Sequence, residues 1–189
     1  MTWRGLAPRS SLVARLIADR RGVSAVEFAL LAPVMILIYL GLTEFCQAYM
    51  AERRVSHTAA MVADLVAQSG KTSKEDLGSV AAIGQMLMKP FPAAPLTTRV
   101  SSVTVDDKGQ AWVDWSYTSN DQVLKPLDKA KPITDLPPGL AGDKESLIIG
   151  ETRYEYRSAF KDVLPELTTF ARKYYLRPRT VNQVICTDC

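Results

Sequence analysis

The sequence predicts an α+β protein: a long N-terminal membrane-spanning helix that continues into a small domain with a mainly antiparallel sheet. Three observations predict this class. Residues 23–42 are apolar with a single charge, residues 43–69 keep a helical spacing of apolar side chains, and alternating β-branched and aromatic residues follow residue 98. The roughly 100 residues outside the long helix suffice for one small core, so we expect a single domain.

The apolar stretch has the length of a membrane-spanning helix. Its 20 residues, Val23 to Leu42, would form a helix about 30 Å long, the thickness of a bilayer's hydrocarbon core. Its one charged residue, Glu27, costs about 3 kcal/mol at mid-membrane, whereas each of its eleven Leu, Ile, Val and Phe residues contributes roughly 0.3–0.6 kcal/mol. Insertion is therefore favoured, and an acid in such a segment indicates a function.

The flanking charges predict the orientation of this helix. Five arginines and one aspartate precede it, so the positive-inside rule places residues 1–22 in the cytoplasm and the chain after about Phe45 in the periplasm. Beyond Gly22 the chain carries 18 basic and 19 acidic residues, a balance that gives no case for nucleic-acid binding. A secretory signal peptide is the alternative, but its apolar region would be shorter and would end at a small-x-small cleavage site.

A family resemblance rests on the start of the apolar stretch. Residues 22–28 read Gly-Val-Ser-Ala-Val-Glu-Phe, so a glycine follows a basic leader and a glutamate is the fifth residue of the apolar helix. This order resembles a type IV prepilin processing site. Over about residues 21–48 the chain resembles the TadE-like family of minor pilins and pseudopilins of the tight-adherence (Flp) pilus system, with a weaker similarity in residues 174–179.

The resemblance implies a cleavage site between Gly22 and Val23. A prepilin peptidase at the cytoplasmic membrane face would cut there and remove the leader. Gly22 offers a bond without a flanking side chain, while Arg20 and Arg21 hold that bond at the lipid headgroups. The expected organisation is then a cytoplasmic leader over residues 1–22, a transmembrane helix over 23–45 and a periplasmic or extracellular pilin-like domain over 46–189.

The resemblance also assigns assembly positions to Glu27 and Phe28. After cleavage, the Glu27 carboxylate can pair with the new α-ammonium of a neighbouring subunit and set the register between subunits. The alternative is a carboxyl near the interface that reaches water or is protonated. The implied partners are the prepilin peptidase, other pilins, the pilus assembly machinery and the lipid bilayer of the bacterial inner membrane, with incorporation into the surface pilus as a further step.

The sequence after the membrane span predicts two helical segments followed by strands. Apolar residues at Val55, Ala59, Val62 and Val66 form a stripe, and Gly70 is expected to cap this helix. The expected elements are helices over residues 43–69 and from 72 or 73 to about 88, strands over 98–105, 111–117, 146–157 and 168–177, a hairpin turn over 106–109, and a long loop over 120–144.

Two apolar faces follow from this assignment. The second helix should bury one set of side chains, and the strand over 111–117 should present alternate residues on one face of the sheet. The helix set is Leu77, Val80, Ile83, Gly84 and Leu87, and the strand set is Ala111, Val113, Trp115 and Tyr117.

No catalytic motif accompanies the titratable residues. His57 is the sole histidine and has neither a nucleophile motif nor a metal-binding partner in the sequence. Asp106 and Asp107 fit turn geometry better than calcium or acid–base chemistry, and Trp112 and Trp115 fit sheet packing better than ligand stacking. We therefore expect no enzyme activity, catalytic residue, cofactor, metal, nucleic-acid partner or small-molecule substrate.

The three cysteines have different expected states. Outside the cytoplasm, Cys186 and Cys189 are positioned to form a local disulfide. A thioredoxin-like role does not suit a pair in the last four residues, and two sulfurs do not complete a zinc site. Cys46 is either an inert apolar side chain or an intersubunit link.

Three functional classes remain from the sequence. The first is a TadE- or TadG-like minor pilin or pseudopilin that acts in pilus assembly and supports surface attachment. The second is an uncleaved, single-pass, membrane-anchored periplasmic binding module. The third, an envelope enzyme, is disfavoured because the sequence contains no catalytic motif.

Overall fold

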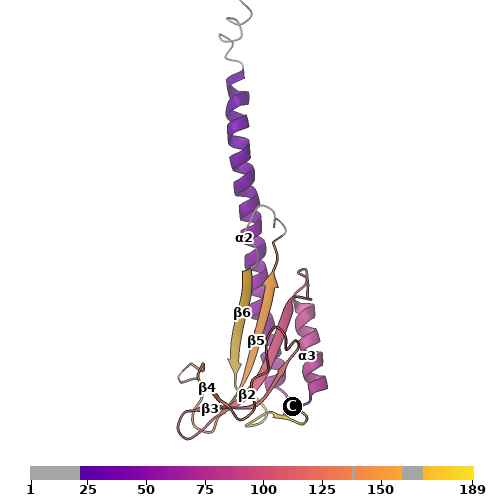
Figure 1. Cartoon of the computed structure of the whole chain (residues 1–189), viewed down its shortest axis with the longest axis vertical. Helices are drawn as coiled ribbons and strands as arrows, with labels where there is room; N and C mark the ends of the chain where they lie inside the picture. Colours follow the sequence, from indigo (N-terminus) through magenta and orange to yellow (C-terminus); the bar gives the residue numbers. More distant parts are fainter. Residues whose placement is uncertain (1–21, 138, 159–167) are drawn as a thin grey trace, which may run out of the picture. The chain divides into compact units, whose positions relative to one another are not determined.

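The computed structural model describes residues 22–137, 139–158 and 168–189 and confirms the α+β class (Figure 1). The chain divides into two compact units, Met1–Thr43 and Glu44–Cys189. Helix α2 spans Val23–Ala67 and is continuous through Pro33. The first unit is described over residues 22–43 as the N-terminal part of this helix, and the second contains the sheet, helix α3 and the rest of α2.

The second unit is built on a five-stranded antiparallel sheet. Its strand order is β4-β3-β2-β5-β6, with β4 at Pro132–Ile133, β3 at Ala111–Thr118, β2 at Leu96–Val105, β5 at Ser146–Tyr156 and β6 at Thr168–Leu176. Four of these strands confirm the predicted segments. The two-residue strand β4 lies inside the segment predicted to be a loop, and a separate pair, β1 (Lys71–Thr72) and β7 (Ile185–Cys186), was not predicted.

The C-terminal part of α2 packs on one face of the sheet. The predicted stripe is confirmed, because Val55, Ala59, Val62 and Val66 are at most 1% exposed. The approach of helix to sheet is close at Gly150 in β5, where an added Cβ would lie 2.7 Å from the carbonyl oxygen of Ala59. Only glycine fits there, a constraint that was not predicted from the sequence.

Helix α3 (Lys74–Leu87) begins as predicted, and its buried face differs from the predicted one at Ile83. Ser73 caps it, and its hydroxyl and backbone exchange hydrogen bonds with Asp76 in a capping box. Leu77, Ala81 and Gly84 are buried, whereas Ile83 is 42% exposed, so its predicted place in the apolar face is wrong. Spacings of four and three put the three buried residues on one side of the helix, and Ile83 lies about 100° or more around the helix from each of them.

A β-bulge corrects the predicted face of strand β3. The pairing of β2 with β3 shifts between Ser102, which faces Trp115, and Val103, which faces Val113. Neighbouring residues of β2 point to opposite faces, so Val113 and Trp115 do as well. Trp115 accordingly joins the cluster under α2, and Val113 joins a separate cluster on the other face. The predicted single face for Ala111, Val113, Trp115 and Tyr117 is therefore wrong.

The long segment after β3 covers the second face of the sheet. Leu127, Ile133, Leu136, Leu140 and Ala141 pack against the cluster of Val103, Val113, Leu147 and Ile149. An ion pair fixes part of this cover, because Lys173 of β6 lies 2.5 Å from the carboxylate of Asp135. The segment is therefore a packed layer, which explains why all five residues from Ser146 to Gly150 are buried.

Residues 177–189, here called the C-terminal strap, close the end of the second unit. The N–H of Arg179 donates to the carbonyl of Ala67, and Val184 is fully buried in the cluster under α2.

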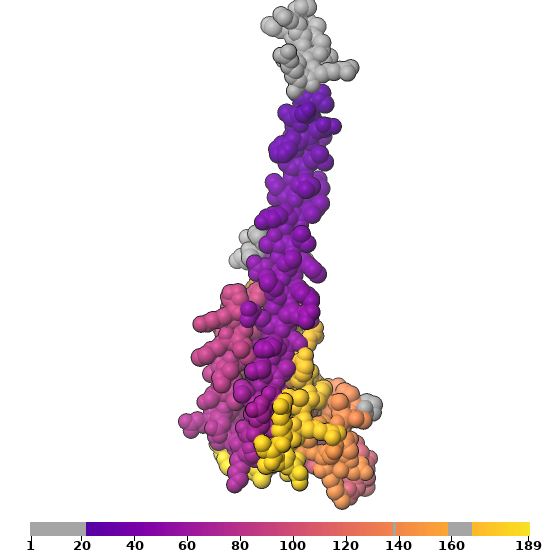
Figure 2. Space-filling view, turned by 180° about the vertical axis from the view of Figure 1, so that it is seen from behind, coloured from indigo at the N-terminus to yellow at the C-terminus, as the bar shows by residue number. Residues whose placement is uncertain are grey.

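Gly70 has no positive φ, so its predicted role as a left-handed cap is wrong. Figure 2 shows the strap and β6, in yellow, along one side of α2, and α3, in magenta, along the other.

Candidate membrane and assembly site

The N-terminal part of α2 is apolar on all sides and uncovered. Its most apolar 18-residue window has no buried residue, and this is a helix long and apolar enough to cross a membrane. Large side chains stay exposed along its length, including Leu30 at 71%, Leu37 at 59% and Leu42 at 60%. An apolar surface of this extent on a folded chain requires cover from lipid or from other proteins.

Glu27 is the one acid in this uncovered segment. Its side chain is exposed, and it forms no hydrogen bond or ion pair with any residue in the described part of the chain. A carboxylate among apolar side chains is stabilised by an opposite charge or a hydrogen-bond donor. The described fold therefore leaves the Glu27 carboxyl open to a group from outside the described residues.

Gly22 immediately precedes the first residue of α2, Val23. A Cβ added at Gly22 would meet nothing within 4 Å, so the described fold imposes no steric need for glycine there. Val23 is 54% exposed and Phe28 is 72% exposed, which leaves both open to contact. Of the predicted site residues, Arg20 and Arg21 lie outside the described residues, as does the leader up to residue 21.

An aromatic and basic group lies on α2 at the C-terminal end of the predicted membrane span. Phe45 and Tyr49 stack with their ring centroids 6.4 Å apart, and the guanidinium of Arg53 lies 5.2 Å from the Tyr49 centroid. Both Nε and Nη2 of Arg53 donate to the Tyr49 hydroxyl. This group was not predicted from the sequence, although the four-residue spacing of its members is visible there. Such residues are typical of membrane–water interfaces.

Glu44, the first residue of the second unit, is a second carboxyl that the sequence analysis missed. Its Oε2 atom is buried without a hydrogen-bond partner. Burial and then the neighbouring Glu44 carboxyl raise the pKa of Tyr156 above its ordinary value, so the phenol stays protonated beside that carboxyl. The Glu44–Tyr156 contact joins α2 to strand β5 at the end of the sheet that contains the aromatic cluster of Phe91, Tyr156 and Phe170.

The remaining candidate residues have structural surroundings. His57 is exposed on α2 without a hydrogen bond to a described residue. Asp106 accepts from the N–H groups of Lys108 and Gln110 in the predicted hairpin turn, and the Trp112 indole also donates to it. These three donors, Trp112 first, lower the pKa of Asp106 and keep it an acceptor.

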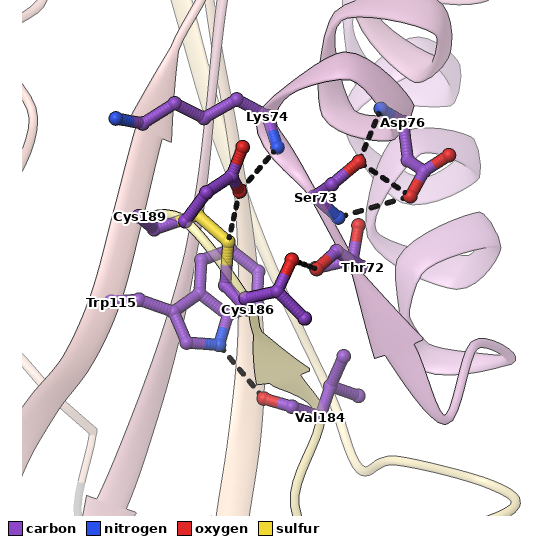
Figure 3. The surroundings of a disulfide bond; sticks show 10 residues. Thr72, Ser73, Lys74, Asp76, Trp115, Val184, Cys186 and Cys189 are labelled. Carbon is purple, nitrogen blue, oxygen red and sulfur yellow. Dashed lines mark hydrogen bonds between the residues drawn. A yellow bond between two sulfur atoms is a disulfide. The ribbon is translucent and has the colours of Figure 1, made fainter.

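The structure pairs Cys186 with Cys189 in a disulfide, with their Cα atoms 5.6 Å apart (Figure 3). Asp188, between them, accepts from the N–H of Lys74 in the first turn of α3. The two sulfurs and this carboxylate lie within 4.8 Å of one another, but disulfide sulfurs are not thiolate ligands. Cys46 is a free, exposed cysteine on α2.

Comparison with known proteins gives one family match, and it covers most of α2. The family model for TadE-like proteins matches residues 22–64. No curated protein and no solved structure matches the chain significantly. The match includes Gly22, Val23, Glu27 and Phe28 and confirms the predicted resemblance: over residues 22–64, this chain is similar to TadE-like proteins.

Proposed function

We propose that this chain is a membrane-anchored minor pilin or pseudopilin that acts in the assembly of a tight-adherence pilus and supports surface attachment. The observation that carries the proposal is the uncovered apolar part of α2, which bears one acid at its fifth position and lies within the TadE-like match. The role requires association with lipid and other subunits and no catalysis by this chain.

Processing is the first step of the proposed role. The prepilin peptidase cuts between Gly22 and Val23 and leaves Val23 with a free α-ammonium. The absence of any steric need for glycine at residue 22 within the described fold supports a requirement imposed by the peptidase. The leader, residues 1–22, is cytoplasmic, and the second unit is periplasmic until the subunit enters a pilus. A reporter fused after Cys189 tests this orientation, since it should be active only if it functions outside the cytoplasm.

Assembly is the second step. The carboxylate of Glu27 pairs with the new α-ammonium of a neighbouring subunit, which offsets the cost of the charge in lipid and sets the register. The exposure of Glu27 and its lack of a partner among the described residues support this role. Phe45, Tyr49 and Arg53 lie at the headgroup layer and hold the outer end of the span there.

Glu27→Gln tests the proposal directly. The substitution removes a charge from lipid and leaves the scissile bond unchanged, so membrane insertion and leader removal should persist. Recovery of other pilins with the affinity-tagged subunit should fall at least about ten-fold, as expected for the loss of a charged hydrogen bond of roughly 1.5–3 kcal/mol. Piliation should fall with it.

Glu52→Gln is the matched control, because it makes the same change on the same helix, in the part that packs on the sheet. Glu52 pairs with Arg172 within the chain, so its loss should leave recovery of other pilins unchanged. Normal piliation and normal pilin recovery with Glu27→Gln would show that Glu27 is a passive interfacial acid. An intact leader in the native host would favour the uncleaved binding module instead.

A further inference from the structure

An open cleft of about 540 Å³ lies on the second unit, between strand β3, the turn at residues 129–130 and the C-terminal strap. Trp112 and Asp114 line it from the strand, and Gln183 and Ile185 line it from the strap. Trp115 and Val184, which Figure 3 shows joined by an indole hydrogen bond of 2.8 Å, form its buried floor. Its volume lies within the range of roughly 300–1,000 Å³ that is common for small-molecule sites.

Trp112 gives this cleft a fixed aromatic surface. The Trp112 side chain is 40% exposed, whereas the next residue of the strand, Val113, is buried on the opposite face of the sheet. Its Nε1–H donates to Asp106 at 3.0 Å, and Asp106 is itself held by two backbone N–H groups of the hairpin turn. The indole is therefore held in place before any ligand arrives, and its polar edge is already satisfied.

The polar groups of the cleft offer both acceptors and donors. Asp114 accepts from the hydroxyls of Ser102 and Thr104 through Oδ2, while its Oδ1 accepts from no described residue. The amide oxygen of Gln183 likewise has no donor among the described residues, and its nitrogen donates weakly to Thr104 at 3.3 Å. The ammonium of Lys129 at the rim forms no ion pair within the described part of the chain.

These features disfavour other ligand classes. An extended peptide would add to the outer edge of β3, but there the N–H of Val113 already donates to Lys131 and its carbonyl already accepts from Ala130. A polyanion is disfavoured because Asp114 balances Lys129. A wholly apolar ligand would leave the carboxylate and amide of the wall unpaired.

We propose that this cleft binds a saccharide. One face of a sugar ring presents C–H groups, which pack on the electron-rich face of Trp112, and its hydroxyls donate and accept at once. Those hydroxyls donate to Asp114 Oδ1 and the Gln183 amide oxygen and accept from Lys129. The inference goes beyond the proposed function and does not rest on it, since the cleft is formed by the second unit alone.

The test uses the full chain in lipid nanodiscs, which avoids detergents with sugar headgroups. The probes are tetrasaccharides of glucose, N-acetylglucosamine and galacturonic acid, with tetra-alanine as the peptide probe. Saturation-transfer NMR detects binding and isothermal titration measures its affinity. At least one tetrasaccharide should bind, and Trp112→Ala should weaken its binding about ten-fold or more.

Asp114→Asn provides a second variant in case Trp112→Ala disturbs folding, and it should also weaken binding several-fold. Tyr174→Ala is the matched control, because Tyr174 is an aromatic residue of similar exposure, 38%, on β6 and outside the cleft. It should bind as the unaltered chain does. Three results would overturn the proposal: no tetrasaccharide binds, both cleft variants bind normally, or tetra-alanine binds in a Trp112-dependent manner.

Discussion

The two parts of α2 differ in what covers them, although they form one continuous helix. Residues 23–43 carry large aliphatic side chains around the whole circumference and leave them exposed. Residues 44–67 carry an apolar stripe of alanine and valine, with Ala51, Val55, Ala59 and Val62 fully buried. Apolar content alone therefore does not show whether a helix packs on a protein core or faces lipid. Its distribution does, because a stripe faces a core and an all-round apolar surface faces lipid or partner helices.

The largest expected difference between the two parts is their tolerance of added volume. Gly150→Val would drive a branched side chain toward the Ala59 carbonyl and the Ala63 Cβ, both 2.7 Å from an added Cβ. We expect it to lower the free energy of unfolding of the second unit by about 3 kcal/mol. The measurement is denaturant unfolding of the full chain in nanodiscs, followed by near-ultraviolet circular dichroism.

Gly41→Val is the control in the other part of α2, because a Cβ at Gly41 meets nothing within 4 Å. It should leave that unfolding transition unchanged. Equal effects of the two substitutions would contradict the contrast between a packed and an uncovered part of the helix.

A second prediction concerns the strap that closes the packed part of α2. Cys189→Ser removes the disulfide and leaves Cys186 reduced beside the cluster under α2. The loop closed by the bond has four residues, so chain entropy predicts a loss of about 2 kcal/mol in the free energy of unfolding. Dithiothreitol should produce the same loss in the unaltered chain and none in the variant. A variant as stable as the oxidised chain would show that the strap is held by its other contacts alone.

The smallest expected effect is a pH dependence of stability that arises in the segment after β3, which covers the face of the sheet opposite α2. Lys173 lowers the pKa of Asp135, first by a hydrogen bond and then by its charge. The folded state therefore favours the charged carboxylate. Its contribution is complete above the ordinary value of 3.8 and is lost as pH falls through the lower folded pKa.

Asp135→Asn should accordingly lower stability slightly at neutral pH and flatten the decline in stability below about pH 4. The asparagine amide has nearly the same shape as the aspartate carboxylate, so the comparison of the variant with the unaltered chain isolates the charge. Denaturant midpoints measured across this range test the prediction. An unchanged slope in the variant would mean that other acids account for the acid sensitivity.

The sequence predicted the parts of the fold that depend on local pattern. The stripe at Val55, Ala59, Val62 and Val66, the capped start of α3 after Ser73 and the hairpin with Gly109 at a φ of 75° all follow from periodicity and turn chemistry. The TadE-like resemblance over the N-terminal helix was likewise visible in the order of Gly22 and Glu27.

The features that the sequence did not predict depend on distant contacts. The bulge between Ser102 and Val103 moves Trp115 to the opposite face from Val113, and no residue in β3 signals it. The close approach at Gly150 depends on α2, about 90 residues earlier in the chain. Likewise, Gly70 is not the cap of α2, because Arg179 of the strap donates to the carbonyl that a local cap would have served.

The most direct test of the central claim, that the uncovered part of α2 is the assembly segment of a processed pilin-type subunit, is the N-terminus of the mature chain in its native host. Mass spectrometry of the purified protein should find it beginning at Val23, and deletion of the prepilin peptidase should restore residues 1–22. Gly22→Phe should also retain the leader while membrane insertion persists. A mature chain that begins at any other residue, or a start at Val23 without the peptidase, would contradict the account.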